Sequence, residues 1–79
     1  MTHSQQRTSV VAANVRAEAA RRNQRQVDLA AVLGVTQPAI SRRLAGEIEF
    51  SVAELQAIAT HLGVSTALLL GEESVAAAS

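Results

Sequence analysis

Apolar residues recur at helical spacing along most of the chain. Val11, Val15 and Ala19 are four positions apart, so they fall on one face of a helix. The surrounding stretch is rich in alanine, the strongest helix former. We predict a first helix that starts near Ser9. It ends near Arg22–Asn23, because asparagine tolerates the left-handed conformation at a helix end.

Four shorter helices are predicted after it, each followed by a glycine that can end a helix. Their spans are Gln26–Leu33, about 37–45, Val52–Leu62 and Thr66–Leu70, and the glycines are Gly34, Gly46, Gly63 and Gly71. Thr36 and Ser65 are suitable N-caps, and Ser51 with Glu54 forms a capping box. Pro38 falls in the first turn of its helix, where a missing N–H has no cost.

One side of each predicted helix is apolar, and these sides form a single predicted core. Its members beyond the first helix are Leu29, Ala30, Leu33, Val35, Ile40, Leu44, Ile48, Phe50, Val52, Leu55, Ile58, Ala59 and Leu62. The chain shows neither the alternation of a strand nor a tight-hairpin dipeptide. The predicted fold class is therefore all-α, with five helices.

Composition narrows the function classes. At 79 residues the chain has room for one small domain. It has no cysteine, and His3 and His61 are far apart, so we expect no metal, no cofactor and no redox chemistry. Asp28, His61 and the serines do not have the spacing of a catalytic triad, so we do not expect an enzyme. No apolar run is long enough for a membrane span, and the polar start lacks a signal-peptide core, so we expect a soluble intracellular protein.

We predict a flexible N-terminal arm at residues 1–8, a folded domain at residues 9–71 and a flexible tail at residues 72–79.

Charge is segregated along the chain although the formal net charge is zero. Residues 1–43 contain seven arginines and two acids, a net +5, whereas residues 44–79 contain five acids and no lysine or arginine, a net −5. The arginines are Arg7, Arg16, Arg21, Arg22, Arg25, Arg42 and Arg43. This asymmetry indicates a half that binds a polyanion, or else a solvated basic face.

The segment QVDLAAVLGVTQPAISRRL, residues 26–44, has the pattern of a helix-turn-helix. Ala30 is small where the second helix crosses the first, Gly34 permits the sharp turn, and Val35 and Ile40 fill the angle between the helices. In such a unit the second helix enters the major groove of DNA.

These residues resemble the Cro and phage-repressor type of helix-turn-helix. Ala30, Gly34 and Ile40 match the family's spacing, as do Gln26 and Gln37 at the starts of the two helices. The segments ARRNQRQ and SVAELQAIATHLGVS also match, so the resemblance covers roughly residues 10–71. It implies a lambda-repressor-like fold and a transcriptional regulator that binds a double-stranded DNA operator. In its segment PAISRRLAGE and its lack of lysine, the chain resembles small Cro-like or immunity-repressor proteins of phages of GC-rich bacteria. The resemblance therefore implies the cytoplasm of a bacterial host cell.

The resemblance assigns base readout to the start of the second helix. Gln37 is expected to contact adenine, and Arg42 guanine or a phosphate. Ser41 is expected to contact a base or a phosphate. Pro38 either touches a thymine methyl group or shapes the turn.

A second group is expected to contact phosphates and so to position the protein. Its members are Arg22, Arg25, Gln26, Thr36 and Arg43. Two of them depart from the family pattern. Arg25 stands where a Ser or Thr N-cap is usual. Arg43 stands where an apolar or aromatic residue is common, so that either the core is thinner there or its stem packs while its head reaches solvent.

Leu68, Leu69 and Leu70 cannot all face one core, so at least one should be exposed on a monomer. With the resemblance, this predicts a homodimer joined by the fifth helix. No small-molecule ligand and no membrane partner are expected. Two alternatives keep the fold: an antitoxin-like regulator whose acidic half binds a basic protein, and a module that binds only protein.

Overall fold

The protein forms five helices and no strand within residues 3–72, the part that the structure, a computed structural model, describes. The helices are α1 (His3–Arg21), α2 (Gln26–Leu33), α3 (Gln37–Leu44), α4 (Val52–Leu62) and α5 (Thr66–Leu70). The predicted all-α fold class is confirmed, and the predicted bounds of α2, α4 and α5 agree with the structure.

The first helix starts earlier than the apolar pattern predicts. It begins at His3, not near Ser9, and so runs through most of the segment predicted as an arm. A helix can continue without an apolar stripe, because the backbone hydrogen bonds do not depend on it. Residues 73–79 of the predicted tail lie outside the described residues.

Local capping explains where the helices begin and end. The Thr36 hydroxyl oxygen accepts a hydrogen bond from the Ala39 N–H at 3.2 Å, and Ser51 and Glu54 form the predicted capping box. At the end of α1, Asn23 has a φ of 57°, which confirms the expected left-handed residue. Gly34 ends α2 with a φ of 68°, a conformation that favours glycine.

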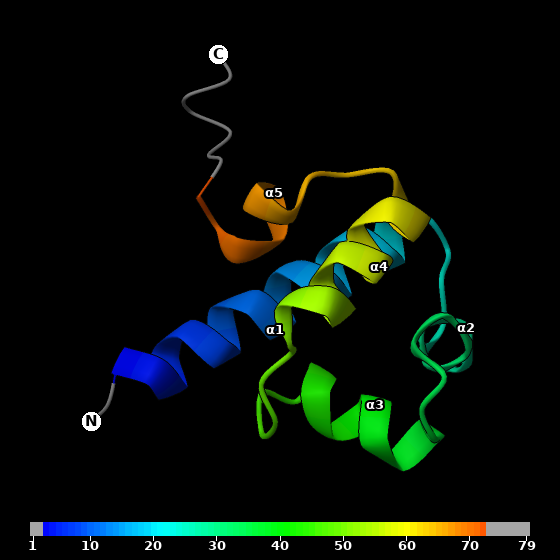
Figure 1. Cartoon of the computed structure of the whole chain (residues 1–79), viewed down its shortest axis with the longest axis horizontal. Coiled ribbons are helices and arrows are strands. Elements are labelled where there is room, and N and C mark those ends of the chain that lie inside the picture. Colours follow the sequence, from blue (N-terminus) through cyan, green and yellow to red (C-terminus); the bar gives the residue numbers. More distant parts are fainter. Residues whose placement is uncertain (1–2, 73–79) are drawn as a thin grey trace.

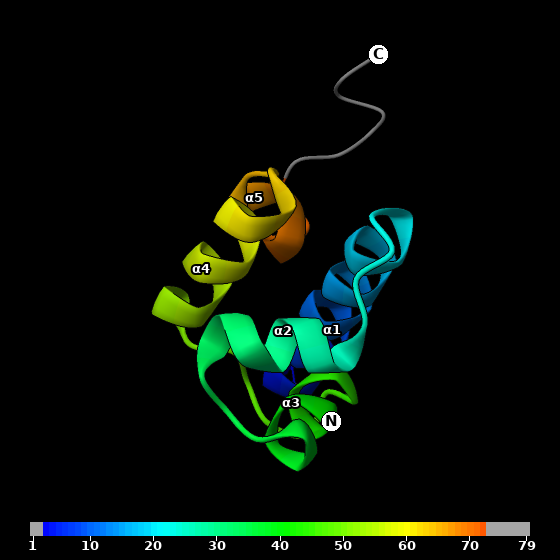
Figure 2. The same ribbon diagram turned by 90° about the vertical axis from the view of Figure 1, so that its right-hand side faces the viewer.

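The helices are arranged with α3 and α5 at opposite ends of the molecule. Figure 1 and Figure 2 show α1 as the long element between them, and α1 contacts both. Helix α4 packs on α2 and α5, and α2 packs on α3. Helix α3 therefore keeps one side turned away from the rest of the chain.

The core agrees with the predicted apolar stripes except at two positions. Its fully buried side chains are Val15, Leu29, Ile40, Ile58 and Leu69. Ile48 and Val52 were predicted to be buried but are 38% and 73% exposed. Ile48 lies in the turn after α3, and Val52 is the first residue of α4, where no other element covers it.

Candidate nucleic-acid interface

Helices α2 and α3 form the predicted helix-turn-helix. Gly34 makes the turn, and the Val35 N–H donates to the Ala30 carbonyl oxygen at 3.1 Å. Ala30 is buried at 6% exposure and Ile40 at 0%, while Val35 packs at the edge of the core. These contacts fix the angle between the two helices.

The outer side of α3 presents the side chains predicted to read bases. Gln37, Pro38, Ser41 and Arg42 are all exposed. Among the described residues, none provides a hydrogen bond or ion pair to the side chains of Gln37, Ser41 or Arg42. The structure therefore brings the predicted readers together on one short helix and leaves their polar atoms available.

The start of α2 adds further polar groups beside a hollow that also touches Leu44 at the end of α3. Gln26 is exposed beside this hollow of about 150 Å³, which Arg16, Gln24 and Leu29 also line. The Arg16 guanidinium donates to the Leu44 carbonyl oxygen and so ties α1 to the end of α3. Arg16 therefore makes a tertiary contact, which its charge and position in the sequence did not predict.

Arg25 precedes α2 with an exposed guanidinium. Its side chain makes no cap hydrogen bond, since a guanidinium has no acceptor. Instead the Asp28 carboxylate accepts from the Arg25 backbone N–H at 2.8 Å, and this hydrogen bond lowers the pKa of Asp28. The Arg25 side chain is 78% exposed, and its Nε is 3.5 Å from the Asp28 carboxylate. It remains a candidate for a phosphate contact.

Arg43 is placed differently from the predicted phosphate contact. Its Nε and one terminal nitrogen donate to the two oxygens of Glu54, both at 3.1 Å, and its other terminal nitrogen donates to the Ala39 carbonyl at 3.1 Å. The Arg43 side chain is 16% exposed. Its head therefore meets an acid of α4 rather than solvent.

The Arg43–Glu54 ion pair predicts an acid-sensitive contribution to stability. Hydrogen bonds from Arg43 lower the pKa of Glu54 below its ordinary 4.5, more than burial raises it. A carboxyl group with a lowered folded pKa stabilises the fold above its unfolded pKa, and this stabilisation is lost as the pH falls through the folded pKa.

We expect Glu54→Gln to lower the free energy of unfolding by on the order of 2 kcal/mol at pH 7. The difference from the wild type should shrink as the pH falls below about 4.5. Urea unfolding of both proteins at pH 7 and pH 3 measures it. The glutamine keeps an oxygen for the Ser51 N–H, and an equal difference at both pH values would contradict this role of the charge.

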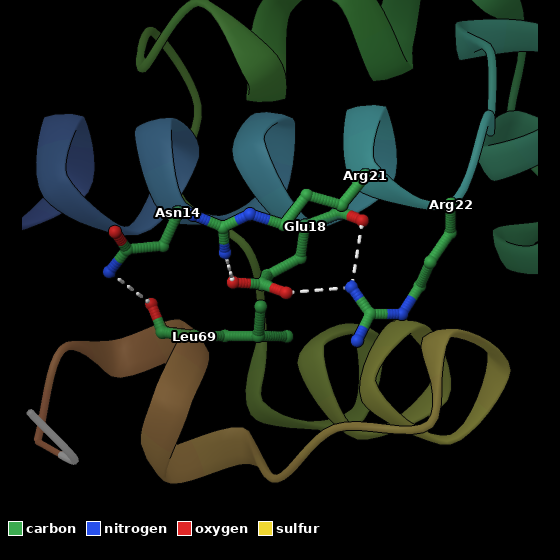
Figure 3. Close-up of polar contacts among 5 residues, drawn as sticks. All are labelled: Asn14, Glu18, Arg21, Arg22 and Leu69. Atoms are coloured by element: carbon green, nitrogen blue, oxygen red, sulfur yellow. Dashed lines mark hydrogen bonds and ion pairs between the residues drawn. The ribbon is translucent and has the colours of Figure 1, made fainter. Parts of the chain in front are cut away.

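Arg22, a predicted phosphate contact, pairs with an acid of its own helix. Figure 3 shows Glu18 between Arg21 and Arg22, on the side of α1 that faces α5. Arg22 is 2.7 Å from one Glu18 oxygen, and Arg21 contacts the other. Glu18 is 7% exposed, so the two guanidinium groups compensate a buried charge. The spacing of Glu18 and Arg22, four positions apart on a helix, was visible in the sequence.

The three leucines of α5 differ in their access to a partner. Leu69 is 0% exposed and belongs to the core. The prediction that it lies in a dimer interface is therefore wrong. The Asn14 side chain donates to the Leu69 carbonyl oxygen at 3.0 Å, which fastens α5 to α1 (Figure 3). Leu68 and Leu70 are half-buried. The expectation that at least one of the three leucines is exposed on a monomer is therefore not met.

His61 is exposed near the end of α4, and its Nε2 lies 2.6 Å from the Gln24 side-chain oxygen. Within residues 3–72, no group of three or more His, Cys, Asp or Glu side chains could hold a metal ion. No helix in that range combines the length and the apolar character that a membrane span requires.

Comparison with known proteins matches residues 17–69 of the chain to the helix-turn-helix family. The matched range includes α2 to α4 entirely and extends into α1 and α5. No curated protein and no solved structure matches the chain.

Proposed function

This chain belongs to the helix-turn-helix family of DNA-binding transcriptional regulators, and we propose that it reads a specific operator in double-stranded DNA as a homodimeric Cro-like protein or repressor. The observation that carries the proposal is the exposed side of α3. Gln37, Ser41 and Arg42 lie there together without partners among the described residues. Amide and guanidinium groups at the start of such a helix match the donor and acceptor pattern of the major groove.

The contacts divide into readers and positioning groups. Gln37 and Arg42 read bases, with Ser41 and Pro38 beside them. Arg25, Gln26 and Thr36 meet the phosphates around the starts of α2 and α3, where the backbone N–H groups and the helix dipoles favour an anion. Arg22 is not included, because its guanidinium is paired with Glu18 on the side of α5.

Leu68 and Leu70 of α5 provide the proposed contact between two copies. Both are half-buried on a helix that lies away from α3 (Figures 1 and 2). For two α3 helices to enter successive major grooves, about 34 Å apart, the second copy must sit beside the first with both α3 helices facing the same way. A two-fold operator follows from this symmetry.

Selection of bound duplexes from a randomised library tests the proposed function. We expect the wild-type protein to enrich an inverted repeat, and sedimentation with the enriched duplex to give two protein chains per site. Absence of enrichment, together with no binding to any duplex at low salt, would overturn the proposal.

The salt dependence of binding separates positioning contacts from readers. Arg25→Ala should weaken binding to every duplex and reduce the slope of log affinity against log salt by about 0.9 per subunit, because one phosphate per subunit is no longer neutralised. Arg21→Ala is the matched control. Arg21 is equally cationic and 67% exposed, but it faces Glu18. A slope that falls equally in both variants would refute the assignment of Arg25.

A further inference from the structure

Arg43 and Glu54 join the proposed recognition helix to α4. The two donor nitrogens of Arg43 and the two oxygens of Glu54 form parallel hydrogen bonds of 3.1 Å. This bidentate geometry fixes both distance and direction, which a single hydrogen bond does not. The side chains are 16% and 22% exposed, so solvent screens the pair only partly.

Both ends of this ion pair are held by their own helices. The Glu54 carboxylate also accepts from the Ser51 N–H at 3.0 Å, and the Ser51 hydroxyl accepts from the Glu54 N–H at 3.0 Å. At the other end, Arg43 donates to the Ala39 carbonyl, one turn earlier in α3. The pair therefore connects the capped start of α4 to the middle of α3.

The other contacts of α3 are its packing on α1 and α2 and the hydrogen bond from Arg16 to the Leu44 carbonyl at its end. Helix α3 has eight residues, and only Ile40 and Leu44 of these are buried. The readers Gln37 and Arg42 lie on the same rigid unit as Arg43. A small rotation of α3 about its two buried residues would move the readers out of alignment with base edges, and the Arg43–Glu54 pair opposes that rotation.

We propose that Arg43 is a positioning residue, which through Glu54 holds α3 at the angle needed for sequence discrimination and does not itself contact phosphate. The inference rests on the proposed function. Three of the five N–H donors of Arg43 are used by Glu54 and Ala39, and the side chain is only 16% exposed, so little of the guanidinium is available to a phosphate.

Two variants and their combination test this inference. Arg43→Met keeps an apolar stem but removes the guanidinium, and Glu54→Gln keeps an acceptor for Ser51 but removes the charge. Affinity is measured for the duplex enriched by the wild type and for a scrambled duplex of the same composition. The ratio of these affinities cancels any general change in attraction to DNA. Glu72→Gln, which removes one charge beyond α5, is the matched control.

We expect each single variant to lower the discrimination ratio about 10-fold, the size of losing roughly one well-formed base contact. The double variant should also lose about 10-fold rather than 100-fold, because both changes break the same ion pair. The salt slope on the scrambled duplex should not become shallower in Arg43→Met, and Glu72→Gln should keep the wild-type ratio.

A slope that becomes shallower by about 0.9 per subunit in Arg43→Met would show a phosphate contact and overturn the inference. A lowered melting temperature with an unchanged discrimination ratio, measured where the variants are folded, would show a purely structural role and overturn it too. Failure of the proposed function is seen in the wild type, which would then discriminate no sequence. Failure of the inference alone is seen only in the variants.

Discussion

Replacing Ile40 with alanine is expected to lower the free energy of unfolding by about 2–5 kcal/mol. Ile40 is 0% exposed and packs where α2, α3 and the rest of the core meet, so its loss leaves a cavity. A domain of this size has roughly 4–12 kcal/mol of total stability. Ile40→Ala should therefore remove a large part of it, as measured by urea unfolding at pH 7.

The matched control is Val52→Ala. Val52 is also a β-branched residue on a helix but is 73% exposed, so we expect a change within about 0.5 kcal/mol. A loss of less than 1 kcal/mol for Ile40→Ala would mean that the angle between α2 and α3 is held by other contacts.

Gln37→Ala combined with Arg42→Ala is expected to abolish most of the preference for the selected duplex over a scrambled one. Each bidentate base contact accounts for about 1–3 kcal/mol of discrimination. Both side chains are exposed and make no hydrogen bond within the described chain, so their removal should leave the fold stable. Fluorescence anisotropy with the two duplexes, together with thermal unfolding, measures both effects.

Gln56→Ala is the comparison for this pair, since Gln56 is exposed on α4 rather than on α3. It should keep the wild-type preference. If the double variant of Gln37 and Arg42 also kept it, these residues would not be the readers, and the proposed orientation of α3 toward DNA would be wrong.

The helix boundaries were predictable because they depend on short-range chemistry. Ser51 and Glu54 are three positions apart and bind each other's backbone, and Gly34 ends α2 through its own backbone conformation. The start of α1 was missed for a related reason. The prediction relied on an apolar stripe, and the residues before Ser9 have none although the helix includes them.

The proposed readers of α3 could also be selected from the sequence, since they follow from the position of α3 after the turn. The partners of the other arginines could not be predicted in this way. Arg22 and Arg43 were assigned to phosphates on their charge and position in the motif, yet both pair with acids of the same chain. Charge shows that an arginine needs an anion, but not which anion it meets.

The amino-acid sequence alone determined the five-helix order, the caps and the turn that make this chain a helix-turn-helix, because each depends on residues within about one helical turn. Only the tertiary structure decided which polar side chains are paired within the chain and which remain available to a partner. The Arg43–Glu54 contact spans 11 positions, Arg16 to Leu44 spans 28, and Asn14 to Leu69 spans 55. Such contacts arise when whole helices pack, so no local pattern specifies them.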